Sequence, residues 1–472
     1  MTSVTSVTSV TSATSATSAT LAAPAERTEQ LLTRARTALH DTPPIGDRAY
    51  VRYCHELARA LTGAWPTVLA ANADDIERAE RRGLPPTLVD RLRVTGEHLR
   101  KMVELTEQVS RELPVVSAGG PRIPAGDWGE LRQIPKPLGV LLMIYEARPT
   151  VTVDGALLPV VVGNSVLLRG GKESSATDAA LAEAVRAALT AAGLPPDLVT
   201  VVDDPDRSVM KALLKRPDAV DVLIPRGSPS LIEYCRTASS IPLIASGGGV
   251  NHLYVHESAD LDLAATVTLD SKLPEPAGCT SVELVLVDRE IAGAYLTALL
   301  RRTEQVAEER TGRQPVRADG RPVPADGEPA LLTVRLDPAV PGPGPEAAHP
   351  GRPWRIVPLE PHDLGREFLD PAIGVLAVDG LGEAARHIRR YGSTHTEGVL
   401  AEDAAVAEEF TRRVDAATVV VNGSLRLHDG PKLGIGAELA IATGRLHVRG
   451  PVTLGSLLTR TWVVEGNGQL RG

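Results

Sequence analysis

The chain has 472 residues, which is enough for two or three domains with large buried cores. A hydrophobic content of 43% and a charged content of 23% exclude fibrous and wholly disordered proteins. The net charge of −9 argues against a general nucleic-acid or anionic-membrane binder, and three cysteines are too few for a disulfide framework. We therefore expect a cytoplasmic protein with no nucleic-acid partner.

The first 24 residues are rich in Thr and Ser, with Thr-Ser-Val triplets followed by Thr-Ser-Ala triplets. This composition predicts a disordered tail. A transit peptide is the alternative, although no arginine precedes Arg27. No stretch of the chain has the ~20 uninterrupted apolar residues of a membrane span, so we expect none.

Helical and strand patterns follow one another along the chain. From Ala25 to about Leu113, apolar residues recur three and four positions apart, which predicts several amphipathic helices. A further helix is expected over Ser174–Ala192, with Gly193 at its end. Short apolar runs bounded by Gly, Pro or Asp predict buried strands at Leu138–Tyr145, Ser165–Leu168, Val199–Val202, Ala219–Ile224, His252–Val255 and Val282–Val287.

The alternation of strands and helices predicts the α/β class, with a doubly wound parallel sheet. Ligands of such sheets bind at the carboxyl ends of the strands. A second set of strand-helix units runs from about Asn251 to Asn422. The Pro/Gly/Arg-rich stretch 312–353 inside it is interpreted as a surface insertion or loop.

The three cysteines have different surroundings. Cys54 and Cys235 lie in helical patterns and are expected to be packing residues. Cys279 follows two prolines and a glycine and precedes a predicted strand, so its thiol is expected on a loop. Two roles remain open for Cys279: a catalytic nucleophile or a small apolar packing residue.

Two segments, Asn164–Lys172 and Val222–Ser228, each contain a predicted strand followed by a glycine-bearing turn. Backbone amides of such turns, together with Arg169, Lys172 and Arg226, are suited to hold phosphate. Neither turn has the G-x-G-x-x-G fingerprint, so ordinary strand-to-helix turns are the alternative.

The sequence offers little support for a metal centre or a serine hydrolase. His252 and His256 fall in an alternating strand pattern, where four residues span ~13 Å, so one metal ion cannot be held by both. No Gly-x-Ser-x-Gly motif is present. We expect no metal.

Several longer motifs carry a family resemblance. They occur in the same order over roughly residues 25–472, and the sequence closely resembles the gamma-glutamyl phosphate reductases of the aldehyde dehydrogenase superfamily. The motifs are PLGVLLMIYEARP (Pro137–Pro149), GNSVLLRGGKE (Gly163–Glu173), LIPRG (Leu223–Gly227), Lys272 with Cys279 and Glu283, YGSTH (Tyr391–His395), LGIGAE (Leu433–Glu438), LHVRGP (Leu446–Pro451) and WVVEGNGQ (Trp462–Gln469).

The resemblance implies an aldehyde-dehydrogenase-like fold. Residues 25–250 would form a Rossmann-variant domain for the nicotinamide cofactor, and residues 251–425 an α/β catalytic domain. Residues 426–472 would return to the cofactor domain and form a small oligomerisation flap. A homo-oligomer is therefore expected, and glutamate kinase is a candidate partner.

By the same resemblance, Cys279 matches the family nucleophile, with Lys272 and Thr150 as further catalytic candidates. Its thiolate would attack an acyl phosphate, and NADPH would reduce the resulting thioester to an aldehyde. Substrate binding is assigned to Arg148, Asn422 and Arg426. Binding of NADP is assigned to Arg169, Lys172, Arg226, Gly227, Ser228, Gly247, Gly248 and Glu438.

The chain also departs from the family pattern. Thr150 stands where the family has Asn, Glu275 replaces a basic residue beside the nucleophile, and Thr280 follows Cys279 in place of Asn. Ser246 occupies the place of the glutamate that activates water in hydrolytic aldehyde dehydrogenases, which favours transfer to phosphate over hydrolysis. A paralogue for a related acyl phosphate, a hydrolytic enzyme and a catalytically silent kinase-binding homologue remain alternatives.

Overall fold

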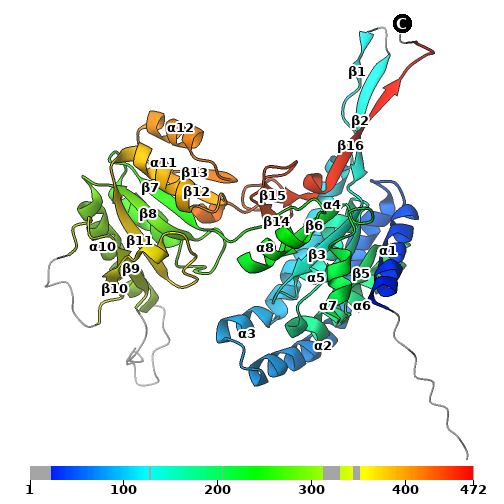
Figure 1. The fold of residues 1–472 in the computed structure, drawn as a ribbon, viewed down its shortest axis with the longest axis horizontal. Coiled ribbons are helices and arrows are strands. Elements are labelled where there is room, and N and C mark those ends of the chain that lie inside the picture. Colours follow the sequence, from blue (N-terminus) through cyan, green and yellow to red (C-terminus); the bar gives the residue numbers. More distant parts are fainter. Residues whose placement is uncertain (1–22, 127–128, 205, 312–329, 344–350, 471–472) are drawn as a thin grey trace, which may run out of the picture.

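The computed structural model describes residues 23–126, 129–204, 206–311, 330–343 and 351–470. Most of the predicted N-terminal tail lies outside these ranges. Figure 1 shows two lobes and a projecting arm. In the described part of the chain, no helix combines the length and apolarity needed to cross a bilayer.

The first lobe is built on a four-stranded parallel sheet with the order β5-β4-β3-β6. These strands match four of the predicted apolar runs: β3 (Val140–Tyr145), β4 (Ser165–Arg169), β5 (Val199–Val201) and β6 (Val222–Arg226). The chain adds β4 and β5 on one side of β3 and then β6 on the other. The strand order therefore reverses between β3 and β6, where Tyr145 is paired with Arg226.

Helices cover both faces of this sheet. Side chains of α2, α4, α5 and α6 share one core with it, and those of α1 and α7 lie in another. The α6 helix ends at Gly193, which has a left-handed φ of 77°, as the sequence predicts. The helices are α1 (Pro24–His40), α2 (Arg48–Arg81), α3 (Pro86–Leu92), α4 (Gly96–Val116), α5 (Val151–Val161), α6 (Ser175–Ala192), α7 (Arg207–Leu213) and α8 (Pro229–Ala238).

The second lobe contains a seven-stranded parallel sheet with the order β10-β9-β11-β8-β7-β12-β13. Helices α9 (Leu261–Asp270) and α10 (Ala292–Thr311) pack into the core on one face, while α11 (Gly380–Tyr391) and α12 (Ala404–Arg413) pack into that on the other. The strands are β7 (Asn251–Val255), β8 (Val282–Asp288), β9 (Leu332–Leu336), β10 (Trp354–Pro358), β11 (Ala372–Val378), β12 (Thr396–Leu400) and β13 (Thr418–Val421).

One expectation needs correction here. The stretch 312–353 is not a surface loop throughout, because β9 lies inside it and pairs with both β10 and β11. Leu332 and Val334 of this strand are fully buried, so the alternation of its side chains outweighs the surrounding prolines and glycines. Residues 312–329 and 344–350 lie outside the described ranges.

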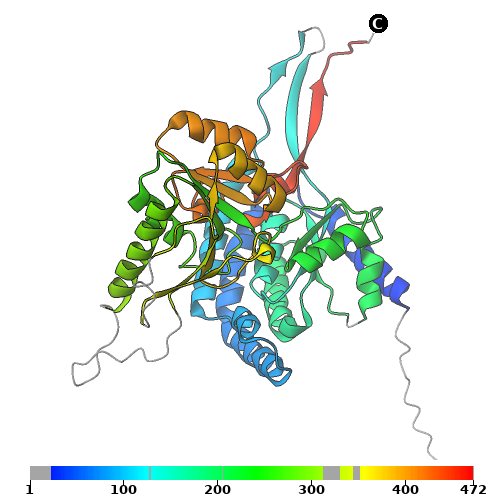
Figure 2. The same cartoon turned by 60° about the vertical axis from the view of Figure 1, so that its left-hand side comes forward.

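The arm is a three-stranded antiparallel sheet with the order β1-β2-β16, and Figure 2 shows it projecting away from both lobes. It joins β1 (Ile123–Pro124) and β2 (Glu130–Pro137) to β16 (Leu458–Glu465) near the other end of the chain. The β16 strand thus pairs within its own chain. A hairpin of β14 (Glu438–Ala442) and β15 (Gly450–Thr453) precedes it.

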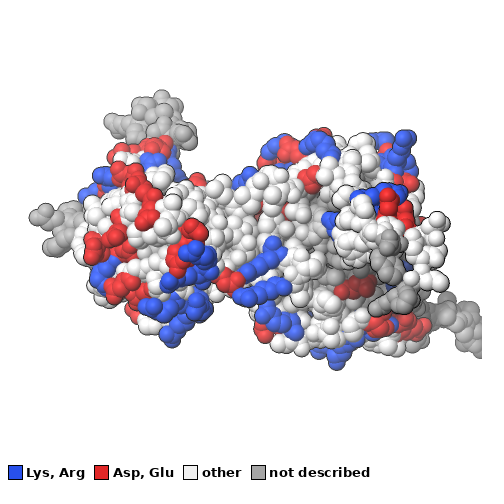
Figure 3. All heavy atoms as spheres, turned by 90° about the horizontal axis from the view of Figure 1, so that it is seen from above, with Lys and Arg blue, Asp and Glu red and all other residues white. Residues whose placement is uncertain are grey.

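The chain crosses between the lobes twice. Ile244 belongs to the core of the first lobe and Asn251 to a strand of the second, so the first crossing lies between them. Leu425 packs in the second lobe and Ala437 in the first, which places the return between these two residues. The space-filling view shows a narrower waist between the lobes, with Lys and Arg side chains on both sides of it (Figure 3).

Candidate active site

Cys279 lies on the loop between α9 and β8, as the sequence predicts, and it is an exposed residue. Cys54 and Cys235 are buried. Two backbone hydrogen bonds of 3.0 Å shape the loop, from Gly278 N to Glu275 O and from Ser281 N to Gly278 O. Of the three cysteine residues, Cys279 is therefore the one within reach of a substrate.

Charges from both lobes act on this thiol. The protein atoms around Cys279 displace water and raise its pKa, although the residue keeps exposed surface. The positive charges of Arg226 and Arg148 oppose this rise, whereas the carboxylates of Glu438 and Glu275 add to it. Cys279 therefore shares one electrostatic environment with the carboxyl ends of strands in the other lobe.

Arg226 ends β6 at the point where the strand order of the first lobe reverses. Burial lowers its pKa, the charge of Arg148 adds to this effect, and Cys279 and Asp154 oppose it. Arg148 itself is exposed, three residues beyond β3. These two predicted arginines thus lie together on the side of the first lobe that acts on Cys279.

The sequence reasoning missed Asp154. This residue lies in the first turn of α5, where burial raises its pKa to about 6 and Arg226 acts in the opposite direction. A signal was present, because Asp154 is the only charged residue in the apolar segment Val151–Val161. Thr150, the predicted catalytic residue before this helix, is half-buried and makes no capping hydrogen bond.

Arg169 is the last residue of β4, and Lys172 lies three residues further along the chain. Lys172 is exposed, and Arg169 is half-buried with Nη1 donating to the carbonyl oxygen of Gly170 at 2.6 Å. A Cβ at Gly170 would lie 2.0 Å from Asp178 Oδ2, and one at Gly171 would lie 2.0 Å from Glu173 Oε1. Only glycine therefore fits this turn without rearrangement of the carboxylates beneath it.

The turn after β6 is less suited to hold an anion than the sequence suggests. Ser228 N donates to Glu146 Oε2 at 2.9 Å, and a Cβ at Gly227 would lie 2.6 Å from the same oxygen. The carboxylate of Glu146 thus already accepts the hydrogen bond of the Ser228 N–H group, which a phosphate would otherwise accept. The assignment of Gly227 and Ser228 to the cofactor stays a prediction.

The first crossing carries Ser246, Gly247 and Gly248, all of them partly exposed. The space beside Gly248 is occupied by Glu367, whose Oε1 accepts a hydrogen bond of 2.9 Å from Gly249 N. Glu438, the first residue of β14, accepts a hydrogen bond from Gly430 N at 2.8 Å. Burial raises its pKa.

Lys272 does not reach the surface beside Cys279. It is fully buried, and Nζ donates to Glu283 Oε2 at 2.9 Å. Burial lowers the pKa of Lys272 and raises that of Glu283 to about 7, against their mutual attraction. The structure therefore gives Lys272 a buried polar contact in place of the expected access to substrate.

Two of the predicted substrate ligands are engaged within the second lobe. The side-chain amide of Asn422 bonds both backbone groups of Ala401, each at 2.9 Å. Arg426 Nη1 lies 3.7 Å from Asp270 Oδ1. Asn422 is exposed, and its amide keeps one N–H donor and one oxygen lone pair with which it can contact a substrate.

The histidines singled out from the sequence are paired with neighbouring side chains. His252 Nδ1 lies 3.1 Å from Glu397 Oε2, and His256 Nδ1 lies 2.9 Å from Ser258 Oγ. Among the described residues, no three His, Cys, Asp or Glu side chains gather in a way that would hold a metal ion.

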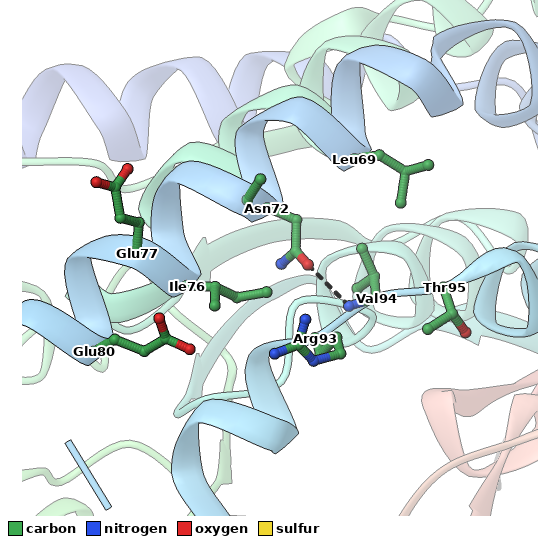
Figure 4. Close-up of a pocket in the computed structure, with 9 residues that line it drawn as sticks. Leu69, Asn72, Ile76, Glu77, Glu80, Arg93, Val94 and Thr95 are labelled. Carbon is green, nitrogen blue, oxygen red and sulfur yellow. Dashed lines mark hydrogen bonds between the residues drawn. The ribbon is translucent and has the colours of Figure 1, made fainter. Parts of the chain in front are cut away.

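A groove of about 420 Å³ lies elsewhere on the first lobe, between α2 and the start of α4. Figure 4 shows Asn72 at its floor, with Oδ1 accepting from Val94 N at 3.0 Å, and Glu77, Glu80 and Arg93 around it. None of the predicted site residues lines this groove.

Comparisons with known proteins show the family to which the chain belongs. Residues 62–316 match the aldehyde dehydrogenase family. A gamma-glutamyl phosphate reductase from Glaesserella parasuis serovar 5 is 36% identical over 440 residues, which cover 93% of this chain and 98% of that protein. The chain belongs to the aldehyde dehydrogenase family and, within it, to the gamma-glutamyl phosphate reductases. It is therefore an oxidoreductase that acts on an aldehyde or acyl phosphate with a nicotinamide cofactor.

Solved structures show the same fold. A gamma-glutamyl phosphate reductase from Thermotoga maritima has a TM-score of 0.80 at 29% identity, and the match covers 94% of this chain and all of that one. An engineered glycolyl-CoA reductase with bound NADP+ has a TM-score of 0.65 at 16% identity, covering 93% and 96% of the two chains. The predicted aldehyde-dehydrogenase-like fold is thus confirmed.

Proposed function

We propose that this enzyme reduces gamma-glutamyl phosphate with NADPH to glutamate 5-semialdehyde and phosphate through a thioester on Cys279, in the cytoplasm. The observation that carries this proposal is the thiol of Cys279, on an exposed loop residue and within the electrostatic reach of Arg226 and Arg148. The high identity to named gamma-glutamyl phosphate reductases over nearly the whole chain supports the choice of substrate.

The residues of the first lobe fit a dinucleotide. In open parallel sheets, ligands bind outside the carboxyl ends of the strands where the strand order reverses, which here is between β3 and β6. Arg169 at the end of β4 and Lys172 after it supply positive charge for phosphate groups, and Arg226 ends β6 beside the reversal. When bound, the cofactor supplies a hydride to the substrate carbon.

The chain's own groups then have distinct tasks. The thiolate of Cys279 forms a bond to the acyl carbon, and the carbon–oxygen bond to phosphate breaks with its electron pair leaving on phosphate. The thioester on Cys279 would hold the acyl carbon for the hydride that the bound cofactor supplies, and cleavage of the carbon–sulfur bond would then return the thiolate and release the aldehyde. Arg148 and Arg226 offset the negative charge of the acyl phosphate and favour the thiolate over the thiol.

Ser246 favours exchange of the acyl group between Cys279 and phosphate over its transfer to water. It lies on the first crossing, at the place where hydrolytic relatives carry a glutamate, and a hydroxyl is a poor base at neutral pH. The carboxylate of Glu367 lies beside the same segment and could replace the missing base, but its Oε1 already accepts a hydrogen bond from Gly249 N.

The test uses the reverse reaction. We expect purified enzyme to reduce NADP+ in the presence of glutamate 5-semialdehyde only when inorganic phosphate is added, and Cys279→Ser to lose activity by at least about 10³-fold. Equal rates with and without phosphate would instead show a hydrolytic enzyme. A Cys279→Ser variant that keeps wild-type activity would refute the thioester.

A further inference from the structure

We propose that Asn251 is a positioning residue that fixes Cys279 for the reaction by tying its loop to the segment that joins the two lobes. This inference rests on the proposed function of Cys279. It goes beyond it by assigning the position of the sulfur to a side chain outside the nucleophile loop, at the first residue of β7.

Asn251 is fully buried, and every hydrogen-bonding group of its amide is used. Nδ2 donates to Cys279 O at 2.8 Å and to Ser281 O at 2.7 Å. Oδ1 accepts from Thr396 N at 3.2 Å. The two donated bonds hold the backbone on both sides of the residue after the nucleophile, so one side chain restrains the loop at two points.

The residue two positions earlier shows how closely the two segments approach. A Cβ built at Gly249 would lie 1.7 Å from Cys279 O, a backbone atom that cannot move without moving the loop. Gly249 N is itself fixed by Glu367 Oε1, and Val250 N donates to Ser393 Oγ at 3.0 Å. The first crossing is therefore held in place on its far side as well.

The acceptor side of Asn251 leads to the second crossing. Thr396 Oγ1 lies 2.7 Å from His428 Nδ1, and both residues are buried. His428 belongs to the segment that returns to the first lobe between residues 425 and 437. Asn251 thus connects the nucleophile loop to both segments that join the lobes.

This connection matters because the cations acting on Cys279 come from the other lobe. A nucleophile must stay within a fraction of an ångström of its attacking position, and displacement by about 1 Å is enough to cost about 100-fold in rate. When the loop is released from Asn251, the sulfur moves away from Arg226 and Arg148. The thiolate then forms at a higher pH.

The chain offers a matched control in the first lobe. Asn164 is also fully buried, its Oδ1 accepts from Gly139 N at 2.9 Å, and its Nδ2 donates to two backbone carbonyl oxygens, of Pro159 and Leu457. Asn164→Ala therefore removes the same set of hydrogen bonds far from the nucleophile loop. Asn251→Ser is a milder variant that keeps a hydroxyl, in case Asn251→Ala fails to fold.

The experiment compares Asn251→Ala, Asn251→Ser and Asn164→Ala with the wild type. We measure melting temperature, kcat and KM in the phosphate-dependent reverse assay, and the pH profile of iodoacetamide alkylation at Cys279 by mass spectrometry. We expect similar melting temperatures for the two alanine variants. Only the Asn251 variants should lose kcat, by about 10- to 100-fold with KM within about twofold, and shift the alkylation profile to higher pH.

Two results would overturn the inference. One is an Asn251 variant with the wild-type alkylation profile and kcat, and the other is an equal loss of kcat in Asn164→Ala. Alkylation needs neither substrate nor cofactor, so this readout still tests Asn251 if the reaction proves to be a different one. Failure of the proposed function is seen separately, as activity that survives Cys279→Ser.

Discussion

The thiol of Cys279 is subject to opposing influences that can be altered one side chain at a time. Burial raises its pKa, Arg226 is the strongest of the charges that lower it, and Glu275 raises it further. Arg226 is half-buried, whereas Glu275 is exposed and its charge is screened by water. The two residues should therefore have effects of opposite sign and unequal size.

We predict that Arg226→Gln slows iodoacetamide alkylation of Cys279 at pH 7.5 roughly three- to tenfold, because less thiolate is present. Glu275→Gln should accelerate it, by about twofold. Arg207→Gln, at the start of α7 in the same lobe, is the control and should leave the rate unchanged. Acceleration in Arg226→Gln would contradict the assigned electrostatics.

For single residues, the sequence predicts exposure to solvent better than it predicts which other residues a side chain contacts. The prolines and glycine around Cys279 exclude regular structure, so its place on a loop is predictable. The burial of Lys272 against Glu283 and the bonding of Asn422 to Ala401 depend on residues that are close only in the folded chain. Local sequence patterns carry no information on such contacts.

Among the elements, the turn between β4 and α6 lies over a buried acid. Asp178 of α6 accepts hydrogen bonds from Thr152 Oγ1 at 3.0 Å and Ser174 Oγ at 2.9 Å. Burial outweighs these bonds and raises its pKa to about 7. The folded chain therefore holds this proton at pH values where the unfolded chain has released it.

This difference sets the sign of a pH dependence. Between about pH 4 and pH 7 the folded state binds more protons at Asp178, so the free energy of unfolding falls as pH rises. We predict that Asp178→Asn removes about 2 kcal/mol of the fall between pH 5 and pH 7, measured by urea denaturation. Asp74→Asn, at an exposed position of α2, is the matched control and should retain the wild-type slope. An unchanged slope in Asp178→Asn would show that this acid is ionised in the folded protein.

The predictability of elements follows from their burial. Strands β3 and β8 are buried along their whole length. The sequence of β3 is an unbroken apolar run, and that of β8 is apolar apart from Glu283 and the final Asp288, so both strands can be recognised from the sequence. The β9 strand is short and flanked by Pro- and Gly-rich segments, so composition hides it. The pairing of β2 with β16 joins residues more than 300 positions apart and has no local signal.

For the molecule as a whole, the arm is the surface best suited to self-association. Trp462 and Val464 are 57% and 61% exposed on β16, an edge strand of the arm among the described residues. Exposed apolar side chains on a free strand edge are typical of an interface. This agrees with the homo-oligomer expected from the family resemblance.

We predict that the enzyme is at least a dimer and that Trp462→Glu shifts it to the monomer, as measured by light scattering at micromolar concentration. Thr461→Glu adds the same charge on the opposite face of β16 and should leave the assembly intact. A wild-type monomer, or a Trp462→Glu variant with unchanged mass, would show that the arm has another role.

The double crossing has a consequence for how the chain is assembled during translation. The core of the first lobe includes Leu439, Val452 and Leu457, which leave the ribosome after the whole second lobe has been made. During translation, the second lobe therefore has all of its packing residues available before the first lobe does. The N-terminal helices must wait, with part of their apolar surface uncovered, until the last residues arrive.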